Sequence, residues 1–440
     1  MTLAKPGALE AVPRFRWRGA VAKLRTNKSH SVILGGSVIM LIGSAVVSAF
    51  NFGYNVATAR VLGPEGFGHA SAAVTLLMLV SAITLSFQLV CAKFVARNET
   101  PGAKQSVYRM LHRKSWFIGL LLAVSMAAAS EPITHYLNLP SRWIVFLLAA
   151  GVAFYVPLGA RRGRMQGTCS FGSLTGNFVL EAVTRFGGAL ALMWIGYGVL
   201  GAVGAITASV VLAYLLPFSH KRQDADQMGA AFVPASFREG MQAIVFFVGQ
   251  VIINNVDILL VKHYFSPEMA GLYAAVALVG RVVYFSSWQV VSAMFPIAAG
   301  DKTSSENSSV LIVPLLLVVG IAVGAVIVLG TFSHAIVTFV FGGRYTEAEP
   351  LLSLYAASTG CYALSVVLMT YEMSRKIANT AWLQMAFSGA LVAGISAFHA
   401  TLQQVIVVQV VLMVLLLATV SFPFFRLRAR NAARALREAA

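Results

Sequence analysis

The sequence predicts an all-α membrane protein with about 12 transmembrane helices in two six-helix lobes. Composition gives the first indication. Hydrophobic residues make up 58% of the 440 residues, charged residues only 11%, and the mean hydropathy is +0.77. Soluble proteins carry about 25% charged residues. The polar residues are therefore too few to cover a water-facing surface, and the chain is expected to cross a membrane many times.

The net charge of +17 is distributed in a way that argues against a nucleic-acid partner. Lysines and arginines stand in short clusters between apolar segments, which is typical of loops retained in the cytoplasm. The three cysteines lie far apart, without the spacing of a metal site or a disulfide framework. No metal site and no cofactor are expected.

Apolar stretches long enough to cross a bilayer of about 30 Å recur along the chain. The third is short, and Gly196-Tyr197-Gly198 alone divides the fifth from the sixth. The twelve stretches are 32–58, 69–95, 115–129, 142–160, 173–195, 199–219, 239–263, 270–297, 310–332, 350–373, 379–398 and 402–425.

The Lys/Arg count predicts the orientation of these spans. One side receives 27 of these residues and the other side 4, among them Lys262. By the positive-inside rule both termini are cytoplasmic. The segments 92–114 and 161–172 are expected to be cytoplasmic loops, and His69 and His263 to lie near the outer interface. The outer loops are short, which excludes an inserted catalytic domain.

An internal repeat divides the chain into two halves. A shift of 203 residues aligns 51–73 with 254–276, and five of 23 positions are identical, including Pro64/Pro267 and Gly68/Gly271. Each segment is expected to contain a tight turn between an outward and an inward helix. With six spans each, the halves run the same way and enclose a central cavity between them. The pattern indicates a V-shaped transporter that works by alternating access.

The repeat predicts the organisation of the chain. We expect five parts in chain order: a basic cytoplasmic tail (1–31), the N-terminal lobe (32–219), a cytoplasmic linker (220–238), the C-terminal lobe (239–425) and a basic cytoplasmic tail (426–440).

The same segments resemble a family. NFGYNVATARVLGPEGFG resembles the first-helix signature of polysaccharide-type flippases in the multidrug/oligosaccharidyl-lipid/polysaccharide exporter superfamily, and 254–281 is similar to the second-half counterpart. The resemblance implies a protein of the bacterial inner membrane without enzymatic activity. It would flip an undecaprenyl-pyrophosphate-linked oligosaccharide, coupled to a proton or sodium ion, and could work with a polymerase or glycosyltransferase of the same pathway. His263 stands opposite Arg60 and Tyr54 opposite Asp257, so the lobes are not chemically equivalent.

Charged residues inside the spans are the candidate site, because each costs about 2.5–3.5 kcal/mol at a helix centre. Glu181 and Arg185 share one helix face at i, i+4 spacing. Either they neutralise each other, or Glu181 carries a coupling ion and Arg185 binds substrate. Arg281 is a candidate phosphate contact or the partner of Asp257. Asp257 in turn is a coupling site or only that counter-ion.

Several polar and small residues accompany these charges. Asn51, Asn254 and Gln250 supply amides that bind substrate or join helices. Gly320 and Gly324 form a GxxxG pair, for which a packing contact is expected.

Other functions fit the sequence less well. A cation-coupled multidrug exporter of the same superfamily would favour an acidic cavity, whereas the charges here are balanced. A major-facilitator transporter has two six-helix halves too, but its usual motif is missing between spans 2 and 3. A lipid-dependent membrane enzyme would need a large outer loop and paired carboxylates. A scaffold protein without transport function would give no reason for the energetic cost of placing Arg281 and Asp257 inside the membrane.

Overall fold

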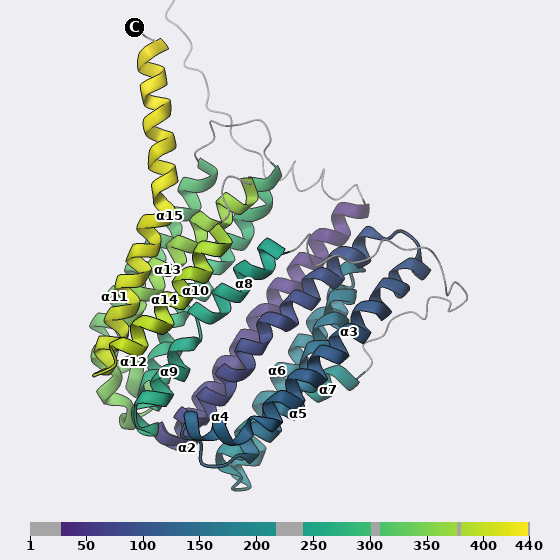
Figure 1. Cartoon of the computed structure of the whole chain (residues 1–440), viewed down its shortest axis with the longest axis vertical. Coiled ribbons are helices and arrows are strands. Elements are labelled where there is room, and N and C mark those ends of the chain that lie inside the picture. Colours follow the sequence, from purple (N-terminus) through teal and green to yellow (C-terminus); the bar gives the residue numbers. More distant parts are fainter. Residues whose placement is uncertain (1–27, 217–240, 301–308, 376–379, 439–440) are drawn as a thin grey trace, which may run out of the picture.

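The structure is a computed structural model that describes residues 28–216, 241–300, 309–375 and 380–438 (Figure 1). Every regular element in these ranges is helical. The first half contains α2 (Lys28–Arg97), α3 (Pro101–Ala128), α4 (Ser130–Tyr136), α5 (Trp143–Gly167), α6 (Phe171–Trp194) and α7 (Gly198–Leu215). The second half contains α8 (Met241–Ile253), α9 (Val256–Tyr264), α10 (Pro267–Gly300), α11 (Ser309–Thr331), α12 (Ser333–Val340), the 3₁₀ helix η3 (Gly343–Ala348), α13 (Glu349–Arg375), α14 (Thr380–Ala397) and α15 (Leu402–Glu438).

Eleven of the twelve predicted spans each fall on one helix, and the seventh (239–263) falls on α8 and α9, which are separated by a break. Eight helical stretches in the described residues are long and apolar enough to cross a membrane, or nine if the bent pair α3–α4 counts as one span. The longest, Ile39–Arg97, has 59 residues and holds two predicted spans. They are separated at Gly63, whose φ of 70° is readily available to glycine alone. The protein is therefore a multi-pass membrane protein.

The two predicted loops are much shorter than the sequence suggests, at 98–100 and 168–170, because helices extend into both segments. α2 runs to Arg97, and α3 starts at Pro101 with the Thr100 hydroxyl accepting a hydrogen bond from the Ala103 amide at 3.2 Å. α5 likewise extends to Gly167. Backbone hydrogen bonds extend a helix past the hydrocarbon without apolar side chains. The end of an apolar run in the sequence therefore does not coincide with the end of the helix.

The predicted boundary between the fifth and sixth spans is confirmed. Gly196 has a φ of 100° and Gly198 a φ of 51°, and these residues separate α6 from α7. Such φ values cost a residue with a Cβ about 1–2 kcal/mol. The glycines therefore stop one helix and start the next.

The helices form two lobes that diverge toward one end of the molecule (Figure 1). In the N-terminal lobe α2 packs against α5 and α6, and in the C-terminal lobe α13 packs against α10, α11 and α15. We call the end where α2 begins the open end, and the end where α4 and α9 lie the closed end. The predicted linker 220–238 lies outside the described residues.

The two copies of the repeat meet each other at the closed end. A Cβ built on Gly271 would lie 1.8 Å from the Pro64 carbonyl oxygen, and one on Gly68 would lie 2.4 Å from the Pro267 carbonyl oxygen. Each glycine thus contacts the opposite copy's Pro-Glu-x-x-Gly segment. Backbones can approach this closely only where both side chains are missing.

The GxxxG pair on α11 does not make the packing contact that the sequence predicts. A Cβ on Gly320 or on Gly324 would find no described atom within 4 Å. The most apolar window of α11 is only 11% buried. Both glycines therefore face away from the neighbouring helices and toward the surroundings of the protein.

Replacing Gly271 with valine should separate the closed end. The new side chain would overlap the Pro64 carbonyl, and overpacking of this kind costs about 1–3 kcal/mol. Spin labels on Glu131 of α4 and Glu268 of α10 should move apart, and the thermal midpoint should fall. Gly320→Val adds the same side chain to an open position and is the matched control. An unchanged label distance in Gly271→Val would show that this contact does not hold the closed end together.

Candidate functional site

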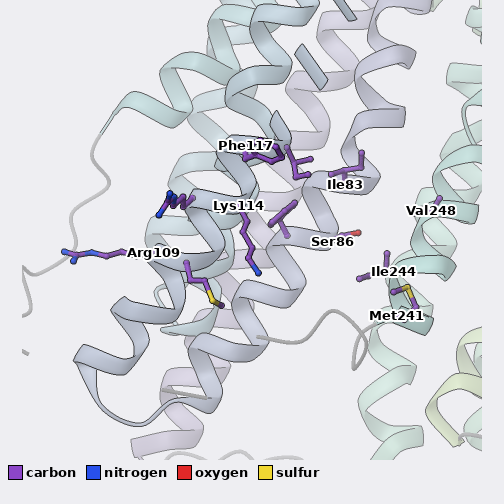
Figure 2. A pocket seen from close by; sticks show the side chains of 12 residues that line it. Ile83, Ser86, Arg109, Lys114, Phe117, Met241, Ile244 and Val248 are labelled. Carbon is purple, nitrogen blue, oxygen red and sulfur yellow. The ribbon is translucent and has the colours of Figure 1, made fainter. Parts of the chain in front are cut away.

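A cavity of about 1000 Å³ lies between the two lobes on the side of the open end (Figure 2). Its walls come from α2 and α3 of one lobe and from α8 of the other. The lining is mainly apolar, with cationic side chains on α3. The lining residues are Ile83, Ser86, Phe87, Arg109, Met110, Arg113, Lys114, Phe117, Ile118, Met241, Ile244 and Val248.

The pattern of α3 explains why cations line this cavity. Its buried positions recur every fourth residue and have small or branched side chains. They are Ala103, Val107, Leu111, Ser115, Gly119 and Ala123. Arg113, Lys114 and Phe117 therefore fall on the opposite, exposed side of the helix. Figure 2 shows Ile244 and Val248 of α8 facing this helix across the cavity, while the Arg109 side chain extends away from α8.

The sequence analysis missed these cations because it assigned them to a loop. The four-residue spacing of buried positions from Ala103 onward was the signal that could have extended the helix to Pro101.

A second group of charges lies inside the N-terminal lobe. The Arg162 guanidinium donates to Glu181 Oε2 at 2.6 Å, and Arg185 donates to Glu181 Oε1. Arg162 also donates to Asn177 Oδ1 at 2.7 Å, and Arg185 to Asn51 Oδ1 at 3.1 Å. The predicted pairing of Glu181 with Arg185 is confirmed. Arg162, which the sequence analysis placed in a loop, is a third member and gives two cations for one carboxylate.

A third polar group lies in the C-terminal lobe around Asp257. Arg281 donates to Asp257 Oδ1 at 2.8 Å, while the hydroxyls of Tyr273 and Tyr355 donate to Oδ2 at 3.0 and 2.8 Å. Arg281 also donates to the Tyr355 oxygen at 3.2 Å, and Gln409 to the Tyr273 oxygen at 2.7 Å. The cross-helix pairing of Arg281 with Asp257 is confirmed. Both Asp257 oxygens have partners, so the carboxylate is well compensated.

The Asp257 network lies beside a break in the membrane helix. α8 ends at Ile253 and α9 begins at Val256. The side-chain amides of Asn254 and Asn255 donate to the carbonyls of Gln250 and Val251, four residues back, at 2.9 and 2.7 Å. Asparagine side chains compete in this way with the helix backbone. The break places Asp257 in the first turn of α9, where a negative charge is favoured by the helix dipole.

A small cavity of about 20 Å³ with a mixed polar and apolar lining adjoins this network. Asn254, Tyr355, Thr359, Tyr362 and Gln409 contribute polar atoms to its lining. A space of this size holds about one water molecule or ion. Gln250 lies on the preceding turn and donates to the Tyr284 hydroxyl.

The structure therefore separates the predicted site residues into two groups. Asn51, Glu181 and Arg185 join in the N-terminal lobe, and Asn254, Asp257 and Arg281 gather around the helix break. None of these residues, and not Gln250, is among the described residues that line the cavity between the lobes. Their roles in binding and coupling stay predictions.

The fold is that of a membrane transporter with two helical lobes. A structure described as the inward-facing conformation of a multidrug resistance MATE family transporter of the MOP superfamily matches with a TM-score of 0.68 and 14% identity, over 88% of this chain and 95% of that one. The lipid II flippase MurJ in an inward closed conformation matches with a TM-score of 0.71 and 11% identity, over 88% of this chain and 87% of that one.

The sequence then assigns the family. Residues 33–300 match the family described as polysaccharide biosynthesis protein, and the chain belongs to this family. A comparison with curated protein sequences gives no match.

An outward-facing structure of the MATE transporter family also matches, with a TM-score of 0.59 and 16% identity, over 95% of this chain and 98% of that one.

A double-mutant cycle should measure the Asp257–Arg281 interaction. Arg281→Met leaves a buried carboxylate without its cation, which costs about 3–5 kcal/mol of stability. Arg281→Met combined with Asp257→Asn should be more stable than the sum of the single changes predicts, by about 0.5–3 kcal/mol. Tryptophan-detected unfolding of the purified protein measures each term. Strictly additive effects would show that the ion pair contributes nothing beyond its separate residues.

Glu181→Gln should destabilise the N-terminal lobe. It removes the one carboxylate that joins Arg162 and Arg185, so two buried cations would face each other at a cost of about 3–5 kcal/mol. The exposed acid Glu347 provides the control, because Glu347→Gln removes the same charge without a buried partner. Equal thermal midpoints for the two variants would rule out this structural contribution.

Proposed function

We propose that this protein flips an undecaprenyl-pyrophosphate-linked oligosaccharide from the cytoplasmic to the periplasmic leaflet of the bacterial inner membrane. The observation that carries the proposal is the cavity between the lobes, which combines an apolar wall with the cations of α3. A lipid pyrophosphate combines the same two features, an apolar chain and an anionic head. Membership in a polysaccharide biosynthesis family and the fold shared with a lipid II flippase support this substrate class.

The cations are suited to a phosphate group by chemistry and by position. Arg113 offers planar paired donors and Lys114 a point charge, and both are exposed on the cavity side of α3. Hydrogen bonds to ionised groups contribute about 1.5–3 kcal/mol each. The excess of basic residues at the open end favours a cytoplasmic orientation for that end and for both termini. Substrate would then load from the leaflet in which it is synthesised.

Coupling to a proton or a sodium ion completes the proposed cycle. Asp257 is supported as a coupling residue by the small cavity beside its network, to which Asn254, Tyr355 and Gln409 contribute. Glu181 is the alternative, in which Arg185 would sense its charge. A polymerase or glycosyltransferase of the same pathway would be the partner that receives or supplies the glycan. A cation-coupled multidrug exporter is the competing function, but cations on the cavity wall oppose cationic drugs.

Removing the cavity cations should impair flipping. Arg113→Ala/Lys114→Ala should lower transport of the lipid-linked oligosaccharide at least tenfold, since each lost contact of about 1.4 kcal/mol corresponds to a factor of ten. The measurement is the accumulation of lipid-linked glycan in the cytoplasmic leaflet, together with loss of surface polysaccharide, in a strain carrying the variant.

Lys104→Ala is the matched control, because Lys104 lies on the same helix outside the described cavity lining. Normal surface polysaccharide in a strain that lacks the protein altogether would overturn the flippase proposal, and drug export would be measured next.

A further inference from the structure

Lys262 is a fully buried cation without a partner. Its exposed fraction is 0%, and its Nζ atom makes no hydrogen bond to any described residue. The Lys/Arg count assigns Lys262 to the outer side and does not predict whether the side chain is buried. In the structure α9 carries Lys262 into the packed interior of the closed end. An ammonium group strongly prefers water or an anion to such an environment.

Lys262 faces the boundary between the two lobes. Leu259, one helical turn earlier on α9, packs into a cluster with Ala73 and Ile144 of the N-terminal lobe. The next residue, His263, stacks on Tyr136 of α4 with ring centroids 3.9 Å apart, and its Nδ1 lies 2.7 Å from the Tyr136 carbonyl oxygen. We call this contact region, formed by these residues together with His69, the closed seam.

The charged and titratable groups around the seam do not neutralise Lys262. On α2, His69 is buried, its Nδ1 lacks a described partner, and its Nε2 lies 3.9 Å from the carboxylate of Glu65. The Glu65 carboxylate attracts Lys262 through space, but its side chain is 74% exposed and makes no described ion pair with Lys262. Asp257 on α9 is bound to Arg281. No other charged group on the neighbouring elements forms a described ion pair with Lys262. These groups are Glu131 on α4, Glu268 on α10, Arg60 on α2, and Arg344 and Glu347 on η3.

The closed seam is the part of the molecule that must separate when the transporter opens outward. Separation would bring Lys262 and His69 from the interior to the walls of a new opening between the lobes. The burial of an unpaired cation opposes closure, and an anion at this position would relieve it. The seam therefore presents at the closed end the same chemistry that Arg113 and Lys114 present at the open end.

We propose that Lys262, with His69 opposite, binds the phosphate groups of the lipid-linked substrate in the outward-open state. This inference rests on the proposed flippase function and adds a second phosphate site to it. The anionic head would pass from the cations of α3 to those of the seam as the cavity changes sides.

Binding of undecaprenyl diphosphate to the full-length protein in nanodiscs tests this site. Gly271→Val holds the seam open, and this variant should bind undecaprenyl diphosphate. Adding Lys262→Met should weaken that binding at least tenfold, and Lys262→Arg should preserve it. Lys104→Met is the matched loss of a lysine away from the seam.

A chemical rescue separates the charge from the shape of the side chain. With the three native cysteines replaced, Lys262→Cys in the Gly271→Val protein should bind weakly. Modification with an aminoethyl thiosulfonate should restore binding, and a neutral methyl reagent should not. Restoration by both reagents would show that only volume matters and would overturn the site.

The remaining outcomes are also decisive. Equal affinities of Gly271→Val with and without Lys262→Met would overturn the inference. Binding by the parent protein but not by Gly271→Val would overturn it too, while the proposed function would stand. If neither protein bound undecaprenyl diphosphate in preference to undecaprenol, the proposed function would fail together with this site.

Discussion

The cost of placing charge inside a membrane protein governs this structure. Each carboxylate of the two interior networks is matched by guanidinium groups, Glu181 by Arg162 and Arg185 and Asp257 by Arg281. Because each network joins side chains from different helices, charge compensation also fixes how those helices pack. The Glu181 network joins α5 to α6, and the Asp257 network joins α9, α10 and α13. The rigidity of each lobe, on which a movement of one lobe against the other depends, follows from these contacts.

Three further cations, Arg113, Lys114 and Lys262, form no ion pair with a described carboxylate. Arg113 and Lys114 line the cavity between the lobes, and Lys262 lies in the closed seam. Both places belong to the boundary between the lobes and not to the interior of either. Compensated charges therefore lie within each lobe, whereas these three cations lie along the boundary between the lobes. An anionic head on an apolar chain is the ligand whose charge complements this arrangement.

The internal repeat explains the shape but not the chemistry. Gly68 and Gly271 occupy equivalent positions and contact the opposite copy, so the pseudo-symmetry passes through the closed end. The halves then diverge. Around Asn51 the helix is continuous, whereas after Gln250 it breaks at Asn254 and Asn255 and places Asp257 at a helix start. The two lobes therefore have similar backbones but different charges. The N-terminal lobe contains two arginines around Glu181, and the C-terminal lobe contains one arginine paired with Asp257.

The sequence by itself determined the membrane class, the helical segments on which the predicted spans lie, and the repeat, and it gave the pairing of Glu181 with Arg185 as one of two alternatives. These features follow from composition and from residue spacing along one helix, so they can be recognised without knowing which helices pack together. Only the tertiary structure decided that Arg162 joins Glu181, that α3 turns Arg113 and Lys114 toward a cavity, and that Lys262 is buried. An apolar run does not show how far its helix extends. The sequence also does not show which side chains are buried, because burial depends on which face of each lobe packs against the other lobe. The sequence therefore identified the charges within the spans, and the fold decided which of them meet a partner.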